Sequence, residues 1–480
     1  MKARFPHFHL IEHAEEYLLY HREASSLIRL SKDFGEIAKQ LQTGKETVEI
    51  AAELGGSEES VSEAISVMER TQSRLDQIKL KTMTREKPIS LYLNVSNACN
   101  LGCGYCFANG GTYNSPPGMM GPDLAFQAVD RFYEAFGHIG TITFFGGEPM
   151  LQAPLIPKVC EYALEQSKRR GASEPAFSLV TNGTLLTPQN VEMLAKYRFG
   201  VTVSIDGPEP INDLLRPTLS GKGSYSKIAS GLRLLKEMGI SPNIESTYTT
   251  KHREMGITPK TLLEFFRDEF GSRSITIGPA AGEVEDSSAT REFYDFLIPA
   301  FREAARFSLE TLGSDRPIVL YQVSHVLGLF FVKEKRPSNQ FCYANLGKDL
   351  FSVSSTGKVF PCQMMNDRAE FDMGHISNAD FSHAPKFQQV QSKFEGMNKE
   401  EMQCHSCWAQ DLCFICVAGV EIETKRLKPI PKHRCDLIRG VIEEILIHLS
   451  RLQGDSQRLD KVLDNCFNRA DEPGSDNKSR

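Results

Sequence analysis

The chain has 480 residues, of which 40% are hydrophobic, and a formal net charge of −6. This length allows about two to four domains with buried cores, and the negative charge argues against nucleic acid as the main partner. No apolar run approaches the roughly 20 residues of a membrane-spanning helix, and the N-terminus contains no signal-peptide stretch. We therefore expect a cytoplasmic protein with no membrane partner, whose 12 cysteines serve as metal ligands before they serve as disulfides.

Residues 1–86 predict a small domain in which three strands precede three helices. The strands are expected at residues 8–11, 17–20 and 26–30. Three amphipathic helices follow, and the third begins after the N-cap residue Ser57. The apolar faces of the helices are Ile37 and Leu41; Val48, Ala52 and Leu54; and Val61, Ile65 and Met68. This order predicts a winged-helix-like unit.

DNA binding is one use of such a unit, but the charge of residues 1–86 has the wrong sign. They contain 12 Lys and Arg against 15 Asp and Glu, a net charge of −3, which disfavours contacts to phosphates. The order of elements also resembles the peptide-recognition element of enzymes that modify ribosomally made peptides. That resemblance implies a leader peptide that adds a strand to an exposed sheet edge. The histidines at positions 7, 9, 13 and 21 are explained by alternating surface positions on strands.

Three cysteines, Cys99, Cys103 and Cys106, follow a predicted strand at residues 89–95. Three thiolates at this spacing can bind three corners of a [4Fe–4S] cluster, and no fourth cysteine lies near. The fourth iron is then open to a cofactor that is bound there and reductively cleaved. The C-x3-C-x2-C spacing, the aromatic Tyr105 and the strand-to-loop context resemble the radical S-adenosylmethionine (SAM) enzymes. A chance cluster of structural cysteines is the alternative.

Strands and helices alternate through residues 87–300, which predicts a parallel sheet with right-handed crossovers. The expected strands are 89–95, 141–145, 177–181, 201–205, 243–249 and 274–278, and the expected helices are 123–136, 155–169, 187–197, 224–238 and 258–270. The fold class is therefore α/β. Six units match the partial (β/α)6 barrel of the radical SAM family, although six units also allow an open sheet. In such barrels function gathers where strands end.

Candidate SAM-binding residues lie on the turns after the second, third and fourth strands. They are Gly146, Gly147, Glu148 and Pro149; Thr181 and Asn182; and Ser204, Asp206 and Arg216. The resemblance implies that the first turn holds the amino group of SAM, that Ser204 donates to a carboxylate or ribose hydroxyl, and that Arg216 pairs with the methionyl carboxylate. Asp206 either caps its turn or acts as a ligand. Tyr105 and Phe107 pack either on adenine or in the core.

Seven cysteines form a second set in the C-terminal part. They are Cys342, Cys362, Cys404, Cys407, Cys413, Cys416 and Cys435. Zinc is the rival interpretation, but a zinc ribbon usually separates its CxxC pairs by a longer hairpin, and seven cysteines exceed one zinc site and fall one short of two. The order resembles the SPASM extension of peptide-modifying radical SAM enzymes, which holds two auxiliary [4Fe–4S] clusters.

That resemblance implies a ligand set for each auxiliary cluster. Cys342, Cys362 and Cys416 would hold the first, and Cys404, Cys407, Cys413 and Cys435 would hold the second. The cofactors would then be SAM and three [4Fe–4S] clusters. Two residues separate Cys413 from Cys416 where the family has three, a departure that bears on Cys416. The first cluster has three cysteine candidates, so its fourth iron would be open to a substrate thiolate.

These features predict a peptide maturase that installs thioether crosslinks in a Cys-rich precursor peptide, with flavodoxin or ferredoxin as electron donor. The Cys407–Trp408 step resembles thioether-forming maturases such as ranthipeptide and sactipeptide synthases and the quinohemoprotein amine dehydrogenase maturase. Sulfatase maturases carry an Asp base after the second SPASM cysteine, whereas here Gln363 follows Cys362, and an amide cannot take that proton. The sequence alone does not identify a general base.

Several other functions remain as alternatives. The same machinery could form carbon–carbon or carbon–oxygen crosslinks, or oxidise Cys or Ser as sulfatase maturases do. From other classes, the chain could be an Fe–S-sensing winged-helix regulator or a zinc-stabilised binding protein. Beyond the first two domains we expect a linker at residues 301–340, the SPASM domain at 341–440, and a C-terminal helix with a polar tail at 441–480.

Overall fold

The computed structural model describes residues 5–14, 16–82, 88–281, 291–332, 334, 345–395, 397, 404 and 406–467. The N-terminal part forms an antiparallel sheet of three strands followed by three helices, as expected. The strands are β1 (Phe8–His13), β2 (Glu16–His21) and β3 (Ser26–Leu30), and the helices are α1 (Lys32–Gln42), α2 (Thr47–Leu54) and α3 (Glu58–Asp76). The side chain of Ser57 accepts a hydrogen bond from the Ser60 amide, which confirms the N-cap of α3. The winged-helix assignment stays a prediction.

Both faces of the N-terminal sheet are covered, because apolar side chains occupy successive positions along its strands. Tyr17 and Leu19 belong to a small core shared with α1, α2 and α3. Leu18 and Tyr20, which point the other way, belong to the main core of the molecule. The sheet therefore lies between the N-terminal helices and the main core, and packs against both.

Two details of the N-terminal part differ from expectation. Val48 and Leu54 of α2 are 57% and 38% exposed, and the helix buries Ile50 and Ala51 in their place. Helix α2 therefore packs on the domain through a different face from the one that the sequence predicted. His21 is completely buried rather than on the surface, because its Nε2 bonds Asp76 at the end of α3 at 3.1 Å.

The central part contains the six expected strands and the five expected helices, each within about two residues of its expected bounds. The strands are β4 (Ser90–Ser96), β5 (Thr141–Gly146), β6 (Ala176–Thr181), β7 (Gly200–Ser204), β8 (Asn243–Tyr248) and β9 (Ser274–Pro279). The helices are α4 (Pro122–Phe136), α5 (Ile156–Arg170), α6 (Pro188–Lys196), α8 (Tyr225–Glu237) and α10 (Pro259–Phe270), with shorter insertions at η1 (Pro149–Gln152), α7 (Glu209–Leu215) and α9 (Thr250–Glu254).

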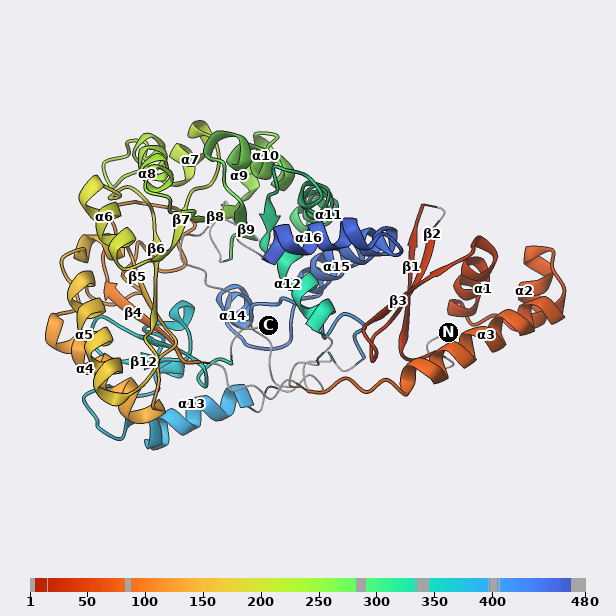
Figure 1. The fold of residues 1–480 in the computed structure, drawn as a ribbon, viewed down its shortest axis with the longest axis horizontal. Coiled ribbons are helices and arrows are strands. Elements are labelled where there is room, and N and C mark those ends of the chain that lie inside the picture. Colours follow the sequence, from red (N-terminus) through yellow and green to blue (C-terminus); the bar gives the residue numbers. More distant parts are fainter. Residues whose placement is uncertain are drawn as a thin grey trace.

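The six central strands are parallel and lie in chain order, from β4 to β9. A doubly wound sheet would reverse its order at one point, so each crossover here turns the same way, as in a barrel. Figure 1 shows the helices from α4 to α11 as an outer arc around these strands, with the N-terminal sheet between this part of the molecule and helices α1 to α3. The α/β class and the parallel sheet are confirmed, and their arrangement is consistent with a radical SAM core.

Three short strands that the sequence did not reveal extend this sheet at both edges. β10 (Val319–Leu320) pairs with β9, β11 (Leu350–Val353) pairs in parallel with β4, and β12 (Val359–Phe360) pairs antiparallel with β11. The full order is β10-β9-β8-β7-β6-β5-β4-β11-β12. The C-terminal part therefore continues the barrel sheet beside its first strand, and β12 leads directly to Cys362.

The remaining elements close the molecule. They are α11 (Arg291–Leu312), α12 (Tyr321–Val332), η2 (Gln363–Met365), η3 (Ala369–Phe371), η4 (Phe381–His383), α13 (Pro385–Glu395), α14 (Val417–Thr424), α15 (Lys432–Leu452) and α16 (Ser456–Phe467). Buried Glu444 on α15 pairs with Arg302 and Arg306 on α11 at 3.2 and 2.6 Å. α11 and α15 run through positions 300 and 440, where we expected domain boundaries. None of the described helices is both long and apolar enough to cross a membrane.

Candidate functional site

The loop after β4 carries the thiols of Cys99, Cys103 and Cys106, all free and partly accessible. Burial raises the pKa of Cys103 to about 12, whereas the nearby Arg216 guanidinium lowers it. Cys99 and Cys106 raise that pKa further, so the three thiols lie within electrostatic range of one another. Bound iron supplies the positive charge that three converging thiolates require, and the donor set therefore fits an iron–sulfur cluster.

The turn after β5 lies directly on the backbone of this cysteine loop. The amides of Gly147 and Glu148 donate to the carbonyls of Ser96 and Ala98 at 2.8 and 2.9 Å. Gly146 has φ +143°, and a Cβ there would lie 2.4 Å from the Ser96 carbonyl oxygen. A Cβ on Gly147 would lie 2.3 Å from the Ala98 carbonyl oxygen. This approach requires both glycines.

The Glu148 side chain is completely buried and joins the turn after β5 to the turn after β6. It accepts hydrogen bonds from Thr181 Oγ1 at 2.7 Å, from the Asn182 amide at 2.7 Å and from the Met150 amide at 2.9 Å. Burial raises the pKa of Glu148 to about 6, while the bonds from Asn182, Thr181 and Met150 lower it. This carboxylate is therefore a link within the protein, and its expected role toward the SAM amino group stays a prediction. Pro149 is buried as the first residue of η1.

The turn after β6 is also hydrogen-bonded to the cysteine loop. Asn182 Nδ2 donates to Asn100 Oδ1 at 2.8 Å and lies 3.7 Å from Cys99 Sγ. Asn100 Nδ2 donates to Thr184 Oγ1 at 2.8 Å. These contacts hold the first cysteine against the end of β6.

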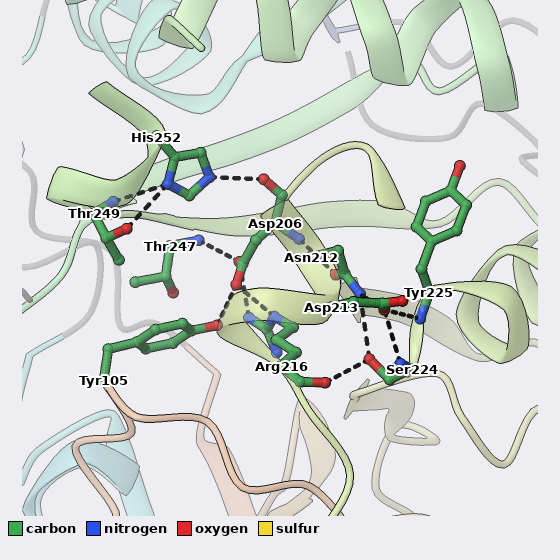
Figure 2. Close-up of polar contacts among 10 residues, drawn as sticks. All are labelled: Tyr105, Asp206, Asn212, Asp213, Arg216, Ser224, Tyr225, Thr247, Thr249 and His252. Carbon is green, nitrogen blue, oxygen red and sulfur yellow. Dashed lines mark hydrogen bonds and ion pairs between the residues drawn. The ribbon is translucent and has the colours of Figure 1, made fainter. Parts of the chain in front are cut away.

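The fourth turn contains a buried ion pair between Asp206 and Arg216, shown in Figure 2. Arg216 Nε and Nη2 donate to the two carboxylate oxygens of Asp206 at 2.8 and 3.2 Å. Tyr105 OH donates to Asp206 Oδ2 at 2.5 Å, and the Thr247 amide donates to Oδ1 at 2.9 Å. Asp206 is thus neither a simple turn cap nor a free ligand. It orients Arg216 and anchors the cysteine loop through Tyr105.

Of the other residues expected at this site, the structure locates Phe107 and Ser204. Phe107 is 37% exposed, which rules out ordinary core packing, and its ring meets Tyr113 edge-on at 6.1 Å. Ser204 ends β7 in register with Glu245 on β8. The adenine contacts of Tyr105 and Phe107 and the SAM contacts of Ser204 and Arg216 stay predictions.

Three residues of this site were missed from the sequence: Thr247, His252 and Glu245. His252 Nδ1 accepts from the Thr249 amide, so its Nε2 carries the proton and donates to the Asp206 carbonyl at 2.8 Å. Glu245 is accessible to solvent on β8, where its neighbours Ile244 and Ser246 are buried. That alternation of a charged residue between buried ones is the signal that could have located Glu245.

The C-terminal cysteines fall into two groups among the described residues, and Cys342 lies outside those residues. Cys416 begins α14, where its sulfur accepts from the Gly419 amide at 3.4 Å, and it lies 3.9 Å from Met364 Sδ in the turn that follows Cys362. Elsewhere, the Cys407 amide donates to the Cys404 carbonyl at 2.9 Å. Burial lowers the pKa of Arg439, but Cys407 and Cys435 beside it raise it more. Cys413 is half-buried in the intervening loop.

A different group of metal-ligand types occurs in the N-terminal part. Among the described residues, His7, His21 and Asp76 bring their ligand atoms within 4.8 Å of one another. His21 Nδ1 accepts from the Ala24 amide at 3.2 Å, so Nε2 carries the proton that His21 shares with Asp76. A metal on Nε2 would require the opposite tautomer, and the group is therefore a hydrogen-bonded His–Asp–His cluster.

Comparisons with known proteins agree with this geometry. A radical SAM superfamily model matches residues 93–265, and a model of the SPASM iron–sulfur cluster-binding domain matches residues 342–408. The chain is 32% identical over 295 residues to a cysteine-type anaerobic sulfatase-maturating enzyme of Clostridium perfringens, a match that covers 57% of this chain and 74% of the relative.

Two solved structures share the fold. Native anSMEcpe with bound AdoMet has a TM-score of 0.63 at 20% identity and covers 76% of this chain and 100% of that one. Streptococcus suis SuiB bound to the precursor peptide SuiA has a TM-score of 0.50 at 15% identity and covers 88% of this chain and 97% of that one. The SPASM match favours iron–sulfur clusters over zinc for the C-terminal cysteines.

Proposed function

Because the chain belongs to the radical SAM enzymes that carry a SPASM domain, we propose that it installs thioether crosslinks in a ribosomally made, Cys-rich precursor peptide. When bound, the cofactors of this family supply a 5′-deoxyadenosyl radical that removes a hydrogen atom from a substrate carbon. We assign the radical SAM cluster to Cys99, Cys103 and Cys106. SAM is assigned to the turns after β5, β6 and β7. In the last of these, the ion pair with Asp206 fixes the position of Arg216.

The observation that carries the thioether assignment is the division of the SPASM cysteines. Cys416 lies beside the turn that follows Cys362, while Cys407 and Cys435 gather around Arg439. With Cys342, which the family resemblance assigns to it, the first group has three cysteines, one fewer than a [4Fe–4S] cluster needs. A substrate thiolate is the natural fourth ligand, since iron binds the deprotonated thiol. We therefore assign two auxiliary clusters, three clusters in all.

The N-terminal domain is proposed to bind the leader of the precursor peptide. Both faces of its sheet are covered, so a peptide strand has to add at an edge, in the β-augmentation mode. The electron donor is proposed to be a flavodoxin or a ferredoxin.

A second candidate is the oxidation of a peptide cysteine as in sulfatase maturation. The 32% identity to a cysteine-type sulfatase-maturating enzyme favours it. The residue after Cys362 disfavours it, because Gln363 offers an amide where a carboxylate base is needed, and its Oε1 lies 3.2 Å from Cys362 Sγ.

Mass spectrometry of the modified peptide tests the proposal. The protein is reconstituted anaerobically with iron and sulfide and incubated with SAM, a low-potential reductant and a Cys-rich peptide encoded near its gene. Loss of two hydrogens together with one alkylatable thiol per bond is expected. Loss of two hydrogens with every thiol retained would replace the proposal by a carbon–carbon or carbon–oxygen crosslink, and conversion of the thiol carbon to an aldehyde would replace it by sulfatase-type oxidation.

A further inference from the structure

Two loops that are distant in sequence meet beside the first barrel strand. One is the cysteine loop after β4, and the other follows Cys362. Asn97 Nδ2 donates to Asp367 Oδ2 at 3.3 Å and thereby joins them. Asn97 is completely buried and is itself fixed, since its Oδ1 accepts from Asn94 Nδ2 at 3.0 Å. β11 pairs in parallel with β4, so the C-terminal segment that leads to Cys362 lies beside the strand that leads to the cysteine loop.

Tyr113, at the far end of the cysteine loop, has an unmet hydrogen bond. Its side chain is 5% exposed, and its hydroxyl has no hydrogen-bond partner among the described residues. Its φ of +52° is also strained for a bulky residue. Burial raises the pKa of Tyr113 well above its usual value, and Cys106, Asp367 and Cys362 raise it further, so its hydroxyl lies in electrostatic range of both cysteine loops.

The turn that contains Asp367 also combines unpartnered buried polar atoms with a residue at positive φ. Asn366 is 2% exposed, and neither polar atom of its side chain has a partner in the described part of the chain. Asp367 adopts φ +57°, which Asp and Asn tolerate better than other residues with side chains. Buried polar groups without partners are costly, and strained backbone clusters where a ligand is held. A ligand with hydrogen-bonding groups, here the peptide, would satisfy both loops.

We propose that Tyr113 and Asp367 contact the peptide substrate, and that Asp367 accepts the proton which the substrate thiol loses. This inference rests on the proposed thioether function. In the reaction one C–H and one S–H bond break and one C–S bond forms. The hydrogen atom goes to the 5′-deoxyadenosyl radical, the proton to Asp367 and the electron to an auxiliary iron–sulfur cluster, so atoms and charges balance.

Other carboxylates of the site are less suited to this role. Glu148 already accepts three hydrogen bonds, and Asp206 is engaged by Arg216, Tyr105 and Thr247. Glu245 is the remaining rival, but it lies on β8, beside the Asp206–Arg216 pair and across several strands from the loop after Cys362.

The first test is Asp367→Asn, which keeps the size of the side chain, its tolerance of positive φ and an oxygen that can accept from Asn97. With a Cys-rich peptide deuterated at the attacked carbon, 5′-deoxyadenosine should still form and carry deuterium. Thioether formed per 5′-deoxyadenosine should fall at least about 100-fold, as expected for loss of a general base. Asp367→Glu should recover part of the loss, and Glu245→Gln should lose less than Asp367→Asn.

The wild-type protein and a binding measurement separate the possible failures. Fluorescence anisotropy of a labelled peptide whose cysteines are replaced by serine should give the same affinity for Asp367→Asn as for the wild type, because no thiolate then binds iron and no proton is transferred. If the wild type forms the thioether and Asp367→Asn couples it to 5′-deoxyadenosine equally well, the assignment of Asp367 is overturned. If the wild type forms no thioether, the proposed function has failed instead.

The second test is Tyr113→Phe, which removes a hydroxyl that has no partner in the described structure. Its thermal unfolding midpoint should equal or exceed that of the wild type, whereas its affinity for the peptide should fall about 2- to 12-fold, the range of one hydrogen bond. Tyr133→Phe is the control, because this hydroxyl is also buried but belongs to the outer helix α4 and to neither cysteine loop. Wild-type affinity in Tyr113→Phe would overturn the contact.

Discussion

At the scale of single residues, the site depends on how closely two turns approach each other. Gly147 packs on the carbonyl of Ala98, one residue before Cys99, at a distance that leaves no space for a side chain. A substitution at Gly147 therefore acts on the position of the first cysteine without touching its chemistry.

We predict that Gly147→Ala lowers iron incorporation and destabilises the apo protein by about 1–3 kcal/mol, the usual cost of overpacking. A Cβ 2.3 Å from a backbone oxygen forces the turn off the cysteine loop. Iron content after reconstitution and urea unfolding of the apo protein measure the two effects. Gly278→Ala on β9, where a Cβ meets no atom within 4 Å, should show neither.

Glu148 gives a prediction for pH dependence. Burial raises its pKa from 4.5 in an unfolded chain to about 6 in the folded protein, so the folded state binds this proton more tightly. The stability that Glu148 contributes is greatest below pH 4.5 and is lost as the pH rises through 6. The shift corresponds to about 2 kcal/mol.

Comparison with Glu148→Gln, which does not titrate, isolates this effect. The stability of the wild type relative to the variant should decrease by about 2 kcal/mol between pH 4.5 and 7.5, measured by urea unfolding of the apo proteins. A difference that stays constant with pH would contradict the raised pKa.

Single-residue roles were the part of the site that sequence predicted least. The spacing of Cys99, Cys103 and Cys106 identifies a cluster loop because three ligands lie within one short segment. The partner of Arg216 could not be found in this way. Asp206, Tyr105 and Thr247 meet only after the barrel strands align, and short polar turns give no periodic signal of that meeting.

At the scale of elements, strands were predicted where apolar residues run together, and short strands were missed. β4 buries Leu91, Leu93 and Val95 completely, a pattern readable from the sequence. β10 and β12 have two residues each, too few for any periodicity. For helix α2 the element was predicted correctly but its buried face was not. Its eight residues include more than one apolar face, and only the tertiary packing decides which of them is buried.

The contact between β1 and the second cysteine group also becomes visible only at this scale. The His9 ring stacks on Trp408 with centroids 3.9 Å apart and planes within 5°, and Tyr20 of β2 meets the indole edge-on at 6.1 Å. His9 Nε2 also bonds Glu443 of α15 at 3.0 Å. The N-terminal sheet thus contacts the residue that follows Cys407.

This contact has a direct optical probe, because Trp408 is the single tryptophan of the chain. We predict that His9→Ala shifts the tryptophan emission of the apo protein to longer wavelength and costs about 0.5–1.5 kcal/mol, the value of an aromatic pair. His13→Ala, on the same strand, is the control and should leave the emission unchanged. Equal spectra for all three proteins would show that the stack does not form in solution.

At the scale of the whole molecule, the C-terminal part is built into the barrel. β11 covers the edge of β4, so a chain ended after residue 332 would leave that edge unpaired. Unpaired edges of hydrophobic strands invite association with other chains. We predict that residues 1–332 elute as aggregates in size-exclusion chromatography, whereas residues 1–467 elute as the full chain does. A monodisperse 1–332 fragment would mean that the barrel is complete without β11.

The two-sided burial of the N-terminal sheet has a consequence for engineering. Ile11, Leu18, Tyr20 and Leu27 are shared with the main core, so the sheet cannot be exchanged as an independent module. A chimaera that replaced residues 1–82 with a different domain would expose apolar surface on both partners unless the graft reproduced that face. If this domain binds the leader peptide as proposed, its specificity is better changed by redesigning the rim of the existing sheet than by swapping the domain.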